Sequence, residues 1–167
     1  MLDRGLFLTS QAIRRQVAAI PCELYLVRLI HYASRRAFPG ERLWTAAQLT
    51  QVSVVRFLRI RNREGCDIFI QPYAGNHNAG YILLDLDRGD PSVLEEMCAH
   101  GHEPCVLLQT SPGHLQAWVR VSVTPLDPII ASTIARSLAS LYEADLARIA
   151  GFSALLRRAR QENSIFS

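Results

Sequence analysis

Apolar residues recur along this chain at the two spacings that distinguish helices from strands. Apolar positions three or four residues apart predict amphipathic helices, whereas short apolar runs bounded by glycine, proline or asparagine predict strands. The pattern predicts helices over residues 10–20, about 45–65, 91–100, about 128–143 and 154–161. It predicts strands over residues 22–30, 67–71, 81–84, 105–108 and 114–123.

The helical spacing also predicts which side of each helix faces the core. Thr45 and Gln48 have the spacing of a capping box, so a helix is expected to begin there. The residues expected to face inward are Ile13, Val17 and Ile20 in the first helix, Leu49, Val52, Val55 and Leu58 in the second, and Ile130, Ile134, Leu138 and Leu141 in the fourth.

The segment from residue 114 to residue 123 alternates polar and apolar residues without a break. This alternation predicts a strand with one buried face and one polar face. Ser111, Pro112 and Gly113 are turn residues that lead the chain into this strand from the preceding one. The core-facing residues would be Leu115, Ala117, Val119, Val121 and Val123, and the polar face would carry His114, Gln116, Trp118, Arg120 and Ser122.

Strands and helices interspersed in this way predict an α+β fold, with a mixed or antiparallel sheet and flanking helices. A chain of 167 residues, 49% of them hydrophobic, fits a single domain over residues 1–167. No apolar stretch approaches the roughly 20 residues that a membrane span needs. The first residues also lack a secretory signal. A cytoplasmic protein without a membrane partner is therefore expected.

Two carboxylates follow the predicted strand 81–84 with one residue between them. If the extended conformation holds through Asp87, then Asp85 and Asp87 point the same way. Neighbouring carboxylates repel each other unless a cation lies between them. Oxygen atoms of carboxylates are the ligands that Mg²⁺ and Mn²⁺ prefer. For these two residues alone, a solvated strand end is the favoured alternative. His114 shares a strand face with Arg120, and either side chain could bind a triphosphate.

The basic residues number 18, and all of them are arginine. The absence of lysine excludes P-loops, Schiff-base enzymes and lysine-adenylate ligases. Genomic codon bias explains this absence better than function does. Arg56, Arg59 and Arg63 nevertheless recur on one face of the predicted helix 45–65. This face is either a solvated surface or a contact for the DNA backbone, and both interpretations stay open.

Four cysteines, at positions 22, 66, 98 and 105, form no C-x-x-C pair and are expected to stay reduced. Cys98, His100, His102 and Cys105 could bind zinc, but a helix, a turn and a strand explain this segment better. No structural zinc is therefore expected. A histidine pair also occurs in nickases with a tyrosine nucleophile, but the glycine between these two histidines disfavours that class.

An ordered series of segments gives the chain a resemblance to a known family. Besides the aspartate strand, the segments are L-W-T-A-A-Q-L from Leu43, R-N-R-E-G-C-D-I-F-I-Q-P from Arg61, G-H-E-P-C-V-L-L-Q-T-S-P from Gly101, L-Q-A-W-V-R-V from Leu115 and I-A-R-S-L-A-S-L-Y-E-A-D from Ile134. In this order they resemble the RepB-type plasmid replication primases, a branch of the archaeo-eukaryotic primase superfamily. The resemblance implies the catalytic domain of such a primase, with an RRM-like core.

The resemblance implies a catalytic site of three acidic residues and a histidine. Asp85, Asp87 and Asp145 would hold two Mg²⁺ or Mn²⁺ ions. His114, assisted by Arg120, would contact the phosphates of the incoming nucleotide. RepB-type relatives often have adjacent aspartates, and asparagine at the histidine position, so this chain is closer to the general superfamily pattern.

The resemblance weakens after the third acidic residue. Asp145 follows a predicted helix, and Asp127 is a less favoured choice for its role. Relatives continue with a longer loop and a basic segment, for which Arg157 and Arg158 are the candidates that would contact DNA. Residues 1–167 do not include the helical domain of relatives. A separate helical domain, or a replication helicase or initiator, is therefore an expected partner.

The sequence thus predicts a DNA primase that joins nucleoside triphosphates into short primers on single-stranded DNA, in plasmid or mobile-element replication. This reaction is a metal-dependent nucleotidyl transfer. The alternative is a non-catalytic accessory module that binds single-stranded DNA and retains the primase fold.

Overall fold

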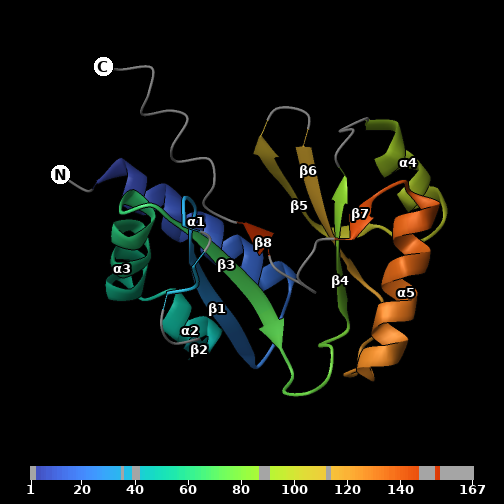
Figure 1. Cartoon of the computed structure of the whole chain (residues 1–167), viewed down its shortest axis with the longest axis horizontal. Coiled ribbons are helices and arrows are strands. Elements are labelled where there is room, and N and C mark those ends of the chain that lie inside the picture. The colour runs from blue at the N-terminus through green and yellow to red at the C-terminus, as the bar shows by residue number, and fades with distance from the viewer. Residues whose placement is uncertain are drawn as a thin grey trace. The chain divides into compact units, whose positions relative to one another are not determined.

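The computed structural model describes residues 3–34, 36–38, 42–86, 91–111, 114–146 and 153–154. The chain divides into two compact units (Figure 1), one formed by residues 1–71 and 154–167 and the other by residues 72–153. The expectation that residues 1–167 make a single domain stays a prediction. No helix in the described ranges is long and apolar enough to cross a membrane.

In its described residues, the first unit consists of a sheet with three helices. Its helices are α1 (Arg4–Ala19), α2 (Ala46–Leu49) and α3 (Val52–Arg63), and α1 packs against α3. The sheet has the strand order β2-β1-β3-β8, from β1 (Leu24–His31), β2 (Arg42–Trp44), β3 (Cys66–Tyr73) and β8 (Ser153–Ala154). Its core includes the buried residues Ile13, Val17, Tyr25, Val27, Leu49, Val55, Leu58, Ile68 and Ile70.

Over the residues that the structure describes, the second unit is a four-stranded sheet with two helices. Its strands are β4 (Tyr81–Leu86), β5 (Pro104–Ser111), β6 (His114–Arg120) and β7 (Asp145–Leu146), in the order β5-β6-β4-β7 with antiparallel neighbours. The helices are α4 (Pro91–Ala99) and α5 (Pro128–Leu141). Alternate residues of β4 and β6 form the core with the helices, namely Ile82, Leu84, Leu86, Ala117 and Val119 together with Met97, Leu138 and Tyr142.

A tight turn sets where β4 begins. The side-chain oxygen of Asn78 accepts hydrogen bonds from the N–H groups of Gly80 and Tyr81, at 2.8 and 3.1 Å. Gly80 has a φ of +86°, which is unfavourable for residues with a side chain. Its carbonyl oxygen accepts hydrogen bonds from the N–H groups of Val121 and Ser122. The turn therefore fixes the register of β4 against the segment that follows β6.

The α+β prediction is confirmed, but some boundaries differ from the predicted ones. Helix α1 begins at Arg4 rather than at residue 10, because the Asp3 carboxylate caps it by accepting from the N–H groups of Gly5 and Leu6. The capping box of Thr45 and Gln48 is confirmed. The helix it opens ends at Leu49, however, and α3 begins separately at Val52.

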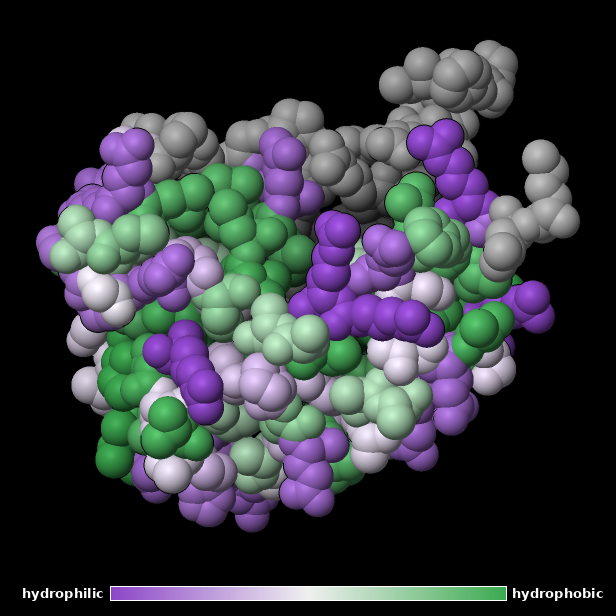
Figure 2. All heavy atoms as spheres, turned by 180° about the vertical axis from the view of Figure 1, so that it is seen from behind, coloured by the Kyte–Doolittle hydropathy of each residue, from purple (hydrophilic) through white to green (hydrophobic). Residues whose placement is uncertain are grey.

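Several predicted inward positions are wrong. Val52 is exposed because it lies in the first turn of a new helix, and Val123 is exposed because β6 ends at Arg120. In α5, Ile130 and Leu141 are exposed, while Ala131, Leu138 and Ala139 are buried. Figure 2 shows that apolar side chains do lie on the surface of this molecule.

Two further predictions need correction. The polar face of β6 is not solvated along its middle, since Gln116 and Trp118 are both buried. Ala154 lies in strand β8 rather than at the start of a helix. The remainder of the predicted helix 154–161 lies outside the described residues.

Candidate active site

Asp85 lies in the centre of a row of polar residues across the second sheet. It is the fifth residue of β4, opposite Gln116 of β6 and opposite Asp145 of β7. The Nε2 amide of Gln116 donates to Oδ2 of Asp85 over 3.4 Å. Asp85 is half-buried and Gln116 is 4% exposed. A buried amide therefore orients a carboxylate that solvent can still reach.

The alternation of β4 explains why Asp85 lies on this face. Leu84 and Leu86 point into the core beneath α4 and α5, so the residue between them must point to the opposite face of the sheet. The sequence prediction placed the strand at residues 81–84, and the strand continues through Asp85 to Leu86.

The backbone after α5 brings Asp145 to the same row. Glu143 has a φ of +48°, and the N–H of Ala144 donates to the carbonyl of Ala139 over 2.9 Å. This turn ends the helix and reverses the chain into β7, where Asp145 begins a two-residue strand. The sequence indicated only that Asp145 follows a helix. The structure places its backbone directly opposite Asp85.

The other acidic candidates have different outcomes. Asp127 caps α5, and its carboxylate accepts from the N–H of Ile129 over 2.8 Å, so it has a structural role. Asp87 lies outside the described residues, as do Arg157 and Arg158. Among the described residues no group of three or more histidine, cysteine or acidic side chains is arranged to hold a metal ion. The three-aspartate metal site therefore stays a prediction.

His114 and Arg120 share one face of β6 but lie at its two ends. His114 is exposed and faces Ser111 of β5. Arg120 faces Tyr81, and its guanidinium carbon lies 5.8 Å from the centre of that ring. Four residues of strand, about 13 Å, separate Tyr81 from Asp85. The structure thus brings His114 closer than Arg120 to the row that contains Asp85.

The predicted basic face of α3 is only partly available to a ligand. Arg59 forms an ion pair with Asp3, with 2.7 Å between Nη1 and Oδ2. The hydrogen bond from Arg59 lowers the pKa of the Asp3 carboxyl below its ordinary value. Arg56 and Arg63 are exposed, and their contact with DNA stays a prediction. The guanidinium of Arg61, on the same helix, lies close to the rings of Phe38 and Phe57.

Side chains of the cysteine and histidine segment form hydrogen bonds with neighbouring elements, and the expectation that it binds no structural zinc stays a prediction. The Tyr142 hydroxyl lies 2.5 Å from Nδ1 of His102 and 3.4 Å from Nδ1 of His100. Burial raises the pKa of this hydroxyl. The Cys105 thiol donates to the carbonyl of Trp118 over 3.1 Å, and burial raises the pKa of this thiol as well. The segment connects α4 and α5 through side-chain hydrogen bonds.

Comparison with known structures decides the family. No family model matches the chain. Over 92% of its length the chain resembles the catalytic domain of primase RepB′, solved in complex with initiator DNA, with a TM-score of 0.77 and 31% sequence identity. The chain covers 80% of that domain. It belongs to the RepB-type plasmid primases.

Two further relatives extend the RepB-type assignment. A second structure, of primase RepB′, matches 88% of this chain with a TM-score of 0.76 and 32% identity, and the chain covers 49% of it. Mobilization protein A of Escherichia coli is 35% identical over 156 residues, which is 87% of this chain and 20% of that protein. The RepB-type chain thus spans about half of one relative and a fifth of the other. The resemblance found in the sequence is confirmed.

Proposed function

We propose that this RepB-type chain is a primase that synthesises short primers on single-stranded DNA, for plasmid or mobile-element replication in the cytoplasm. The observation that carries the proposal is the opposition of Asp85 and Asp145 across two antiparallel strands, in a chain of this family. Like charges directly opposite each other destabilise a sheet. A protein gains from such a pair when the carboxylates have a cation to bind.

The donor set fits Mg²⁺ or Mn²⁺. Carboxylate oxygens are the ligands that these hard ions prefer, and Asp85, Asp87 and Asp145 would supply them. When bound, a pair of such ions activates the attacking hydroxyl and stabilises the leaving pyrophosphate. The Gln116 amide holds one oxygen of Asp85 in place and so orients the carboxylate before any ion binds.

The remaining residues position the nucleotide. In primer extension the 3′-hydroxyl of the growing strand attacks the α-phosphate of the incoming triphosphate, and pyrophosphate leaves. His114, exposed on the same strand face as Gln116, would contact the triphosphate. Arg120, at the far end of the strand, would contact a more distant part of the nucleotide or the template. A separate helical domain, or a helicase or initiator, would act alongside this chain.

The DNA partner is supported by the family. The RepB′ catalytic domain was solved with initiator DNA, and we infer that a single-stranded template is the substrate here, with nucleoside triphosphates. No membrane partner enters this proposal.

Template-directed primer synthesis tests the proposal. The assay combines the protein with mixed single-stranded DNA, all nucleotides and Mg²⁺ or Mn²⁺. Wild type should make primers, and Asp85→Asn should make none, because a metal ligand is lost. Gln116→Ala should lose roughly tenfold in activity, because the supporting hydrogen bond is lost. Glu95→Gln, a neutralised exposed acid on α4, is the matched control and should retain full activity.

One outcome would contradict the proposal that the chain is a primase. If folded wild type binds single-stranded DNA and still makes no primer when a helical partner domain is supplied, the chain is a non-catalytic accessory module.

A further inference from the structure

Aromatic rings and arginines alternate on the first unit in an arrangement that the catalytic site does not use. The guanidinium carbon of Arg61 lies 4.8 Å from the ring centre of Phe38 and 5.4 Å from that of Phe57. The guanidinium carbon of Arg42 lies 5.0 Å from the Phe57 ring centre. Trp44 meets Phe57 edge-on, with 6.4 Å between ring centres. We call these five residues the stacking ladder.

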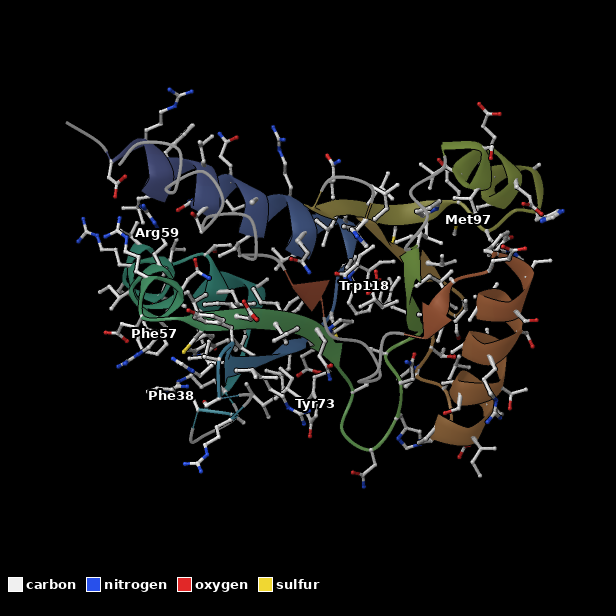
Figure 3. All side chains as sticks on the ribbon, turned by 45° about the horizontal axis from the view of Figure 1, so that its top comes forward. Phe38, Phe57, Arg59, Tyr73, Met97 and Trp118 are labelled. Carbon is white, nitrogen blue, oxygen red and sulfur yellow. The ribbon has the colours of Figure 1, made fainter. Side chains whose placement is uncertain are left out.

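The stacking ladder comes from three segments of the first unit. Phe57 and Arg61 lie one helical turn apart on α3, Arg42 and Trp44 belong to β2, and Phe38 lies between β1 and β2. Figure 3 shows the Phe38 and Phe57 side chains close to each other beside α3.

Packing and an ion pair hold part of the ladder in place, and part of it is accessible. Trp44 and Phe57 pack partly against the core of the first unit, which fixes their rings. Arg61 is further held by Glu64, with 2.7 Å between Nη1 and Oε2. Phe38 is nevertheless 38% exposed, and the Arg61 side chain is 30% exposed. Side chains that are already ordered lose little conformational entropy when a ligand binds.

The charge of the chain favours an anionic ligand at this unit. Residues 1–71 contain 11 arginines against five aspartates and glutamates, a net charge of +6. Residues 72–153 contain four arginines against nine acidic residues, a net charge of −5. The overall charge of +3 conceals this division. A strongly basic surface concentrates polyanions such as nucleic acids.

We propose that the stacking ladder binds single-stranded nucleic acid by stacking on its bases, while the arginines contact the phosphates. Every base has a flat aromatic face, so a rigid array of rings binds strands of many sequences. Arginine suits the mixed role, because its planar guanidinium stacks on rings and also donates paired hydrogen bonds to phosphate. A duplex does not fit this surface, since base pairing and stacking already cover the faces of its bases. The identity of the strand as the template rests on the proposed function.

The test compares two strands that differ only in their bases. Binding of a short oligothymidylate and of an abasic strand of equal length is measured by fluorescence anisotropy, with EDTA present so that no reaction occurs. Wild type should bind the oligothymidylate roughly tenfold more tightly, which corresponds to one stacked base. Phe57→Leu should abolish this preference and leave abasic binding almost unchanged.

Arginine variants separate stacking from charge. Arg61→Lys keeps the positive charge but loses the planar group, and it should also lose roughly tenfold in oligothymidylate affinity. Arg15→Lys is the matched control, because Arg15 is exposed on α1 and outside the stacking ladder, and it should behave as wild type. If thermal melting shows that Phe57→Leu does not fold, Phe38→Leu replaces it, since the Phe38 ring is more exposed.

Several results would overturn the inference. These are equal wild-type affinity for the two strands, equal competition by a duplex, or ladder variants that keep the wild-type preference. Asp85→Asn should retain the preference. A failure of primer synthesis with the preference intact would therefore remove the proposed reaction and leave the stacking surface. Primer synthesis by a wild type that shows no preference for oligothymidylate would support the proposed reaction and remove the stacking surface.

Discussion

Gly80 illustrates how one residue can determine the position of a whole strand, β4. A Cβ atom at this position would lie 2.4 Å from the carbonyl oxygen of Ser122, which is far inside van der Waals contact. The backbone also has the positive φ that side chains disfavour. Because the turn leads directly into β4, a displacement here would move Asp85 relative to Gln116.

Gly80→Ala should lower the free energy of unfolding by about 2 kcal/mol or more, since both backbone strain and a steric clash oppose it. Gly75→Ala is the matched control, because Gly75 also has a positive φ but has no atom within 4 Å of an added Cβ. It should cost about 1 kcal/mol. Urea denaturation measures both values. Equal losses for the two variants would show that the contact with Ser122 has no energetic importance.

Asp3 and Arg59 connect two elements, the start of α1 and the middle of α3. The hydrogen bond from Arg59 holds the pKa of Asp3 below its ordinary value of 3.8. A carboxyl with a lowered pKa in the folded state stabilises the fold above the unfolded pKa, and this contribution is lost as the pH falls through the folded pKa. The stabilisation should therefore be present at neutral pH and fade below about pH 4.

Asp3→Asn should lower the melting temperature at pH 7 and have less effect at pH 3. The measurement is a series of thermal melts of both proteins between these two values. A difference that stayed constant with pH would mean that Asp3 acts only as a neutral helix cap.

The rotation of helix α5 about its own axis is a second feature at the scale of the elements. The helical spacing of apolar residues predicted a face with Ile130, Ile134, Leu138 and Leu141 inward. The structure instead leaves Ile130 and Leu141 exposed and buries Ala131 and Ala139 along with Leu138. Ile130 and Ala131 are adjacent in sequence but differ in burial. The stabilities of one variant at each position therefore show which face of α5 is inward.

Ala131→Asp should destabilise the protein by about 3 kcal/mol or more, because it places a carboxylate where Ala131 is only 5% exposed. Ile130→Asp, at a position 52% exposed, should change stability by less than about 1 kcal/mol. Denaturant unfolding of both variants checks the orientation. The reverse order of effects would mean that the predicted face was correct.

The sequence predicted elements with strong patterns and missed those that depend on distant partners. The alternation from His114 and the capping box of Thr45 are local, and each correctly predicted the type of element and where it begins. Strand β7 has two residues and no pattern of its own, since it forms only by pairing with β4. The break at Thr50 and Gln51 had no glycine or proline to mark it.

The candidate site shows the same limit. Asp85, Asp145 and His114 could be selected from the sequence through the family resemblance. Gln116 was assigned to the correct face of its strand, but its contact with Asp85 depends on the register of two strands, which no local pattern specifies. The pairing of Arg59 with Asp3 likewise joins residues far apart in sequence.

At the scale of the whole molecule, opposite charges divide the proposed tasks. The carboxylates proposed for metal binding lie in residues 72–153, where acidic residues exceed arginines. The stacking ladder lies in residues 1–71, where arginines exceed acidic residues more than twofold. We therefore expect salt to weaken the proposed DNA binding by the first unit far more than the proposed binding of a divalent ion by the carboxylates.

Strand β7 also bears on self-association. It forms one edge of the second sheet, and an exposed sheet edge can template the addition of strands from other molecules. An edge strand of only two residues offers few backbone groups for such pairing. The short strand that brings Asp145 opposite Asp85 would thus also limit aggregation of the protein.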